Sequence, residues 1–153
     1  MTKILFICHG NICRSPMAEF IMKDLLQKRG LADKFYVESA ATSREETGNP
    51  VYPPARRDLE KHGISCAGKT ARQVTKGDYA AFDWILYMEQ YNFPRLMKIL
   101  GTDPQGKVHR LLDFSPNPRD IDDPWYTGDF DGVYREISEG CRDFLNDLEE
   151  HHG

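Results

Sequence analysis

No stretch of this sequence is apolar over the length that a membrane-spanning helix requires. We also expect no signal peptide, because the first predicted strand begins within a few residues of the first residue given. We therefore expect no membrane partner and a cytoplasmic location, and export without a signal stays open.

The sequence also lacks an excess of positive charge. Its 20 Lys and Arg residues stand against 24 Asp and Glu residues, which gives a formal net charge of −4 at pH 7. Nucleic acids and anionic membranes are not attracted to the average surface of such a protein. We expect no nucleic-acid partner, and any positive potential must be local.

Cysteine is sparse, and the four cysteines form no paired repeats with histidine at zinc-ligand spacing. We predict no metal, no other cofactor and no structural disulfide framework, and a catalytic thiol needs a reducing compartment. Four histidines without partners at ligand spacing are assigned to the solvated surface: His62, His109, His151 and His152.

The 153 residues alternate predicted strands with predicted helices, and a 40% hydrophobic composition suffices for the core of one domain over residues 1–153. Such alternation predicts an α/β fold, in which helices cover both faces of a parallel sheet and ligand binds at the carboxyl edge of the strands. The predicted strands lie near 3–8, 35–41, 83–88 and 107–112. The predicted helices lie near 16–29, 53–62, 75–81, 89–100 and 130–150, with a long loop before the last.

The last predicted helix is amphipathic, so we expect it to pack on the sheet, with Cys141 as a packing residue. Its apolar face consists of Val133, Ile137, Cys141, Phe144, Leu145 and Leu148.

The first predicted strand runs directly into Cys8-His9-Gly10-Asn11-Ile12-Cys13-Arg14-Ser15, which a helix follows; this helix is predicted to have Pro16 and Glu19 in its first turn. Backbone N–H groups of such a turn and the positive end of a helix bind a phosphate dianion and stabilise a thiolate. A cysteine placed there beside cations ionises more readily than a free thiol. We interpret the run as an anion-binding loop that contains its own nucleophile, Cys8.

The other residue types in this loop fit the same chemistry. Arg14 presents a planar fork of donors that can hold two phosphoryl oxygens. Gly10 permits close approach of the backbone to a ligand and tolerates a positive φ, and Asn11 visits the left-handed region cheaply. The Ser15 hydroxyl can donate to the Cys8 sulfur. The alternative for the cysteines of the run is a packing role near the core, but the complete run between a strand and a helix favours catalysis.

The run I-C-H-G-N-I-C-R-S-P-M-A-E resembles the signature of the low-molecular-weight protein tyrosine phosphatases. The resemblance implies a flavodoxin-like three-layer sandwich whose four-stranded parallel sheet has the order 2-1-3-4. It also implies a phosphoric monoester hydrolase that acts on phosphotyrosine in proteins or peptides, and on small aryl phosphates, and that phosphate-like oxyanions inhibit. Further similar segments span nearly the whole chain: 39–43, 48–50, 71–74, 82–88 and 122–126.

The same resemblance assigns roles to single residues. A thiolate that attacks a phosphate monoester needs a proton donor opposite it for the leaving oxygen. The resemblance implies that Cys8 forms a phosphocysteine and that Asp123, immediately before the proline, is the general acid and then the base. Trp125 and Tyr126 resemble an aromatic wall for the substrate ring, and Ser39 resembles a loop-supporting residue. Phosphate binding is implied for Arg14 and for the loop residues His9, Gly10, Asn11, Ile12, Cys13 and Ser15.

Several readings of these residues stay open. Asp-Asp-Pro is ordinary turn composition, so the aspartates near position 123 could be solvated loop charges. One of Trp125 and Tyr126 could pin the loop to the body of the protein instead of touching substrate. Cys8 and Cys13 could form a reversible disulfide under peroxide, which would protect Cys8 from irreversible oxidation.

Three positions depart from the family pattern. His9 replaces a residue that is often apolar, and we interpret it as a rim residue of the loop. The stretch Arg44-Glu45-Glu46 is charged where many relatives carry an aromatic residue, which leaves peptide preference open. Lys69 stands where some relatives have a histidine, so that either the loop network is smaller or a water takes the place of the histidine.

Two tyrosines near these segments, Tyr52 and Tyr91, are assigned to packing.

Two other functions use a similar loop. Thioredoxin-coupled arsenate reductase needs resolving cysteines from a later segment, but residues 85–100 contain none, and Cys66 and Cys141 do not stand at the relay positions. A phosphocysteine carrier that does not hydrolyse its phosphoryl group does not need Asp123. The sequence therefore favours the phosphatase over both alternatives.

Overall fold

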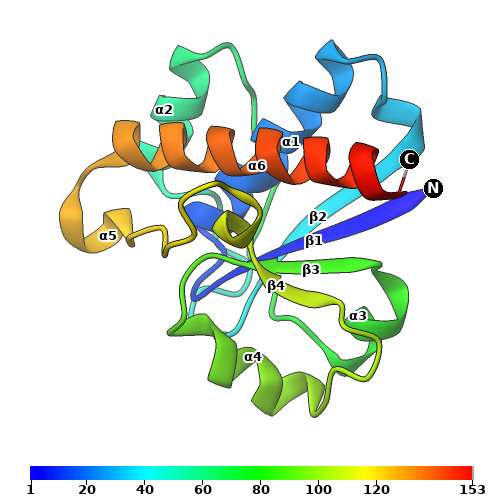
Figure 1. The fold of residues 1–153 in the computed structure, drawn as a ribbon. Helices are drawn as coiled ribbons and strands as arrows, with labels where there is room; N and C mark the ends of the chain where they lie inside the picture. The colour runs from blue at the N-terminus through cyan, green and yellow to red at the C-terminus, as the bar shows by residue number, and fades with distance from the viewer. Residues whose placement is uncertain (153) are drawn as a thin grey trace.

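A parallel four-stranded sheet lies at the centre of the computed structural model, which describes residues 1–152 (Figure 1). Its order is β2-β1-β3-β4, which confirms the order that the resemblance implied. All three neighbouring pairs are parallel. The strands are β1 (Thr2–Cys8), β2 (Phe35–Ala41), β3 (Trp84–Tyr87) and β4 (Val108–Arg110).

Helices cover both faces of this sheet, as predicted for an α/β sandwich. Figure 1 shows α1, α2 and α6 on one side of the strands and α3 and α4 on the other. The bounds are α1 (Arg14–Lys28), α2 (Pro53–Lys61), α3 (Lys76–Ala81), α4 (Asn92–Leu100) and α6 (Phe130–His152).

The interior strand β1 contributes residues to two hydrophobic cores, one on each face of the sheet. Its residues from Ile4 to Cys8 are all buried, because layers lie on both faces. Ile4 and Phe6 belong to the core beneath α1 and α6, and Leu5 and Ile7 belong to the core that residues of α4 complete. Period-two alternation in one apolar run thus divides β1 between the two layers.

Helix α6 packs by the face that the sequence predicts. All six residues of its apolar stripe are buried, Cys141 among them, and Cys141 is fully enclosed in the core. Gly140 lies so close to the short helix η2 (Leu111–Phe114) that an added Cβ would stand 2.9 Å from side-chain atoms of Leu111 and Leu112. The close approach positions the end of β4 and the long segment that follows it.

Two predictions about local structure were wrong. The segment between β4 and α6 is not a loop throughout, because it contains η2 and a one-turn helix, α5 (Pro124–Thr127). Helix α1 begins at Arg14, before Pro16, so Glu19 does not lie in its first turn. Glu19 is instead buried, and its carboxylate serves the site described below.

The carboxyl ends of the strands meet at one edge, which is the edge where α5 lies in Figure 1. Cys8 ends β1 and pairs in register with Ala41 at the end of β2. Both chain termini lie at the opposite edge. Among residues 1–152, no helix combines the length and the apolar character needed to cross a bilayer.

Candidate active site

The loop from Cys8 to Arg14 has the left-handed turn that an anion cradle requires, but at one residue only. Asn11 has a φ of 60° and is the single residue other than glycine with a positive φ within the described chain. Gly10 does not adopt a positive φ, so the prediction of left-handed backbone is confirmed at Asn11 and not at Gly10. The side chain of Asn11 is buried and can therefore fix this conformation through hydrogen bonds.

Two donors of Ser15 point at the Cys8 sulfur. The Ser15 hydroxyl oxygen lies 3.0 Å from Cys8 Sγ, and the Ser15 backbone N–H donates to the same sulfur at 3.4 Å. The amide of Asn11 donates to the Ser15 hydroxyl oxygen at 2.8 Å. That oxygen already accepts from Asn11, so its own hydrogen can point at sulfur or at the Ala40 backbone carbonyl, which is the longer contact at 3.5 Å. Negative charge on Cys8 is thereby stabilised from both groups of Ser15.

The same amide also ties the loop to β2. Asn11 Nδ2 donates to Ser39 Oγ at 2.9 Å, and Ser39 in turn donates to a carboxylate oxygen of Glu19 at 2.6 Å. The side-chain oxygen of Asn11, Oδ1, accepts from the backbone N–H of Arg72 at 3.2 Å. The ammonium of Lys69 donates to the Ser39 backbone carbonyl at 2.9 Å and lies 3.4 Å from Glu19. Lys69 is thus a direct member of the network, so the expectation that Lys69 leaves the network smaller was wrong.

Arg14 is buried, and its guanidinium joins three segments. Nη1 donates to the Ile121 carbonyl at 2.8 Å, the Glu89 carboxylate lies 3.3 Å away, and Nη2 lies 3.5 Å from Asp123. Burial alone would lower the pKa of Arg14, but negative charges at Cys8, Asp123 and Glu89 outweigh it, so the pKa is raised. The guanidinium keeps its charge at the floor of the site.

Asp123 begins the one-turn helix α5. Its Oδ1 accepts from the Trp125 backbone N–H at 3.0 Å, which makes Asp123 the N-cap, while Oδ2 faces Arg14. The side chain retains 22% of its exposure, so a ligand can reach it. One carboxylate therefore caps α5 and faces the Arg14 guanidinium.

Trp125 and Tyr126 differ in how they are held. The Trp125 ring packs on Tyr52 with centroids 4.7 Å apart, whereas Tyr126 is 84% exposed. Both rings line the cavity above Cys8. Trp125 is thus fixed to the body of the protein and still forms a wall, and Tyr52 packs as predicted.

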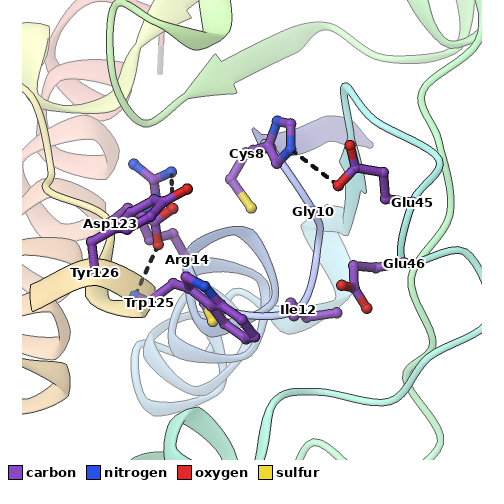
Figure 2. A pocket seen from close by; sticks show the side chains of 11 residues that line it. Cys8, Gly10, Ile12, Arg14, Glu45, Glu46, Asp123, Trp125 and Tyr126 are labelled. Atoms are coloured by element: carbon purple, nitrogen blue, oxygen red, sulfur yellow. Dashed lines mark hydrogen bonds and ion pairs between the residues drawn. The ribbon is translucent and has the colours of Figure 1, made fainter. Parts of the chain in front are cut away.

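The cavity that these segments enclose measures about 180 Å³ and contains Cys8 in its lining. Figure 2 shows Asp123 and Tyr126 on one side of the Cys8 sulfur, and Glu45 and Glu46 on the other. His9 lies at the rim, with Nε2 3.8 Å from the Glu45 carboxylate. Of the predicted loop residues, the lining includes His9, Gly10, Ile12, Cys13 and Arg14, while Asn11, Ser15 and Ser39 lie behind it as support.

Comparison with known proteins identifies the family to which this chain belongs. Residues 3–152 match the family described as low molecular weight phosphotyrosine protein phosphatase. The protein-tyrosine-phosphatase YfkJ of Bacillus subtilis is 39% identical over 152 residues, which cover 98% of this chain and 97% of YfkJ. The chain belongs to the low molecular weight phosphotyrosine protein phosphatase family.

A second relative and a solved structure of the first agree with this assignment. The human low molecular weight phosphotyrosine protein phosphatase is 37% identical over 147 residues, covering 93% of this chain and 92% of the human protein. The crystal structure of YfkJ has a TM-score of 0.95 to this fold at 38% identity, covering 100% of this chain and 98% of that one. The resemblance noted from the sequence, the flavodoxin-like fold and the class of phosphoric monoester hydrolases are thereby confirmed.

Sequence reasoning missed two carboxylates of this low molecular weight phosphatase. Glu89 follows β3 and contacts Arg14, and Glu19 accepts from Ser39 inside α1. Glu89 has a signal in the sequence, because it stands directly after a predicted strand, where the carboxyl edge gathers functional side chains. Tyr91 was wrongly assigned to packing, since it is 53% exposed at the mouth of the site.

Cys13 differs chemically from Cys8. It is buried at the start of α1, and burial raises the pKa of its thiol, with a further rise from the charges of Cys8 and Asp123. A neutral thiol at Cys13 is a poor nucleophile at neutral pH. The two cysteines of the loop therefore have separate environments.

The remaining histidines take no part in this site. His62 stacks on Tyr134 with centroids 3.7 Å apart, and His109 is half-buried beside Trp84 and Phe114, so His109 is not a solvated surface residue. His151 is exposed, and the His152 side chain lies outside the described residues. Within the described residues, no three His, Cys, Asp or Glu side chains are arranged to hold a metal ion.

Proposed function

We propose that residues 3–152 form a single protein tyrosine phosphatase domain that hydrolyses phosphotyrosine and small aryl phosphates through a phosphocysteine on Cys8. The observation that supports this most is the convergence of three groups on one cavity: the Cys8 sulfur with two Ser15 donors, the Arg14 guanidinium and the Asp123 carboxylate. Those groups supply a nucleophile, a fixed cation for the phosphoryl oxygens and a proton donor.

The first step forms a bond between Cys8 Sγ and phosphorus while the bond from phosphorus to the tyrosine oxygen breaks. Arg14 and the N–H groups of the loop bind the equatorial oxygens throughout. Asp123, in its protonated form, gives its proton to the departing oxygen, which leaves as a neutral phenol. Trp125 and Tyr126 line the cavity beside the ring, where stacking contributes about 0.5–1.5 kcal/mol beyond burial.

The second step releases phosphate. Asp123 is now a carboxylate and removes a proton from a water that attacks phosphorus, while the bond from sulfur to phosphorus breaks. Cys8 departs as a thiolate, which the Ser15 hydroxyl and backbone N–H stabilise. Inorganic phosphate and similar oxyanions occupy the same cradle and are therefore expected to inhibit. A reactive thiol of this kind suits a reducing compartment such as the cytoplasm.

Neither alternative function finds support in the positions of the other cysteines or of the acid. Cys141 is enclosed beneath α6, and Cys66 is buried beside a separate pocket near the end of α2. A resolving thiol for arsenate reduction would have to reach Cys8 from one of these places. A phosphocysteine carrier has no use for Asp123 beside Arg14.

The test is a kinetic comparison of the wild type with Cys8→Ser on a phosphotyrosine peptide, a phosphoserine peptide and arsenate. We expect catalytic release of free phosphate from phosphotyrosine and from para-nitrophenyl phosphate without thioredoxin, little from phosphoserine, and no reduction of arsenate. Activity that survives in Cys8→Ser overturns the proposal.

A further inference from the structure

A second cavity opens directly beside the active site. It measures about 530 Å³ and shares His9, Asp123 and Tyr126 with the cavity above Cys8. Glu89, Tyr91 and Asp122 also line it. A substrate residue next to a phosphotyrosine bound over Cys8 would therefore have a ready place in this second cavity.

The charge of this cavity is negative. Two of its three carboxylates, Glu89 and Asp123, already face Arg14 at 3.3 Å and 3.5 Å. Asp122 is exposed and makes no hydrogen bond or ion pair with any residue in the described part of the chain. One carboxylate in the wall thus remains available to a cation from outside.

The rings around the cavity are unusually exposed for their size. Five large hydrophobic side chains are exposed in the described residues, and three of them, Tyr91, Trp125 and Tyr126, surround the mouths of these two cavities. The Tyr91 ring already accepts a cation, since the guanidinium of Arg95 stacks 3.6 Å from its centroid. The aliphatic stem of a long basic side chain can pack on such rings while its charged end reaches Asp122.

We propose that this second cavity binds a lysine or arginine side chain that neighbours the phosphotyrosine in the substrate, with Asp122 as its ion-pair partner and Tyr91 and Tyr126 as its walls. The proposal rests on the phosphatase function proposed above and names its peptide preference. An acidic side chain in the same position is repelled by Asp122 and Glu89. Glu45 and Glu46, on the far side of Cys8, add repulsion of the same sign.

The experiment uses one phosphotyrosine peptide in versions that carry Arg, Ala or Glu at the positions immediately before and after the phosphotyrosine. The readout is the ratio of kcat/KM between the Arg and Ala versions, with para-nitrophenyl phosphate measured for each enzyme. We expect a ratio of about two to five for the wild type, because an exposed ion pair contributes modestly. Asp122→Asn should bring this ratio close to one, and Asp122→Lys should make the Glu version the better substrate.

Asp33→Asn is the matched control, since Asp33 is exposed in η1 (Ala32–Lys34) ahead of β2 and the substitution changes the net charge equally. A wild-type ratio of one, or an equal fall in Asp33→Asn and Asp122→Asn, overturns the proposal. If the wild type does not hydrolyse para-nitrophenyl phosphate at all, the result contradicts the proposed phosphatase function instead. Binding of the same peptides to Cys8→Ser, measured by calorimetry, then tests the cavity without turnover, and equal affinity for the Arg and Ala versions overturns it.

Discussion

The Nη2 atom of Arg14 lies 3.5 Å from the Oδ2 atom of Asp123, although the two residues are more than a hundred positions apart in the sequence. The same guanidinium donates to the carbonyl of Ile121 at 2.8 Å. Arg14 therefore holds the start of the segment that carries Asp123, in addition to facing the anion site. In the proposed mechanism, phosphate binding and placement of the acid therefore depend on one side chain.

The two oxygens of Asp123 have separable functions, which gives a sharp test of its role. Asp123→Asn retains an oxygen that can accept from the Trp125 N–H and cap α5, but it cannot give a proton. We expect its kcat/KM for phenyl phosphate to fall by about 10²–10⁴, because protonation of a poor leaving group is lost. For an aryl phosphate with a strongly acidic phenol the fall should be far smaller.

Asp123→Ala removes the cap as well, and it serves as the comparison. Any additional loss in Asp123→Ala measures the ordering of α5, which should affect good and poor leaving groups alike. An equal loss for both kinds of leaving group in Asp123→Asn would remove Asp123 from the role of general acid.

The layers of this fold could be predicted from the sequence, but the order of its strands could not. Strand β1 reads as a continuous apolar run because both of its faces are buried, and the helices follow at regular intervals. Periodicity does not tell which strands pair, so the order came from the resemblance of the loop motif. Helix α5 was missed because its four residues, Pro124–Thr127, are too few to show a helical period.

The candidate site likewise consists of residues that the sequence motif predicts and of contacts that it does not. Cys8, Arg14 and Ser15 are close in the sequence, so their chemistry could be read from the motif. The contacts of Glu19 and Lys69 with Ser39 could not be predicted, because they exist only after β2 and the loop containing Lys69 have packed beside α1. Hydrogen-bond networks between distant segments leave no local pattern in the sequence.

Ser15 supplies both of the donors that face the Cys8 sulfur, and Ser15→Ala removes the stronger one. The hydroxyl at 3.0 Å is lost while the backbone N–H at 3.4 Å remains. We expect kcat to fall by up to about two to three orders of magnitude, because removal of one donor to developing negative charge costs about 2.7–4 kcal/mol in comparable sites. The exposed Ser65→Ala is the matched control and should leave kcat unchanged. Wild-type kcat in Ser15→Ala would show that the hydroxyl does not support the thiolate.

The cysteines should react selectively with a haloacetamide at pH 7. Burial raises the pKa values of the Cys13, Cys66 and Cys141 thiols. These thiols are therefore neutral at pH 7 and react slowly. Cys8 lines an open cavity and receives the Ser15 donors. Peptide mass mapping should find the label on Cys8 alone, in step with loss of activity, and inorganic phosphate should slow both. Labelling of Cys13 at a comparable rate would contradict this assignment.

Asp58 should limit stability at neutral pH, because it is a buried carboxylate with one unpaired oxygen. Its Oδ1 faces the Lys61 ammonium at 3.2 Å, but no group in the described residues pairs with Oδ2. Burial and the neighbouring Asp131 raise the pKa of Asp58, against the opposing effect of Lys61. The folded protein therefore binds this proton more tightly than the unfolded chain, and the associated stability is lost as the pH rises through the raised pKa.

Asp58→Asn avoids this cost, since its amide cannot ionise. Asp131 stays paired with Lys61, whose ammonium lies 2.7 Å from its Oδ1. We expect Asp58→Asn to gain about 1 kcal/mol at pH 7–8, which raises Tm by about 2–4 °C. The gain should vanish below the ordinary pKa of aspartate, near 3.8. Thermal unfolding from pH 3.5 to 8 checks this, with Asp33→Asn as the exposed control, and a gain that does not change with pH would contradict the ionisation argument.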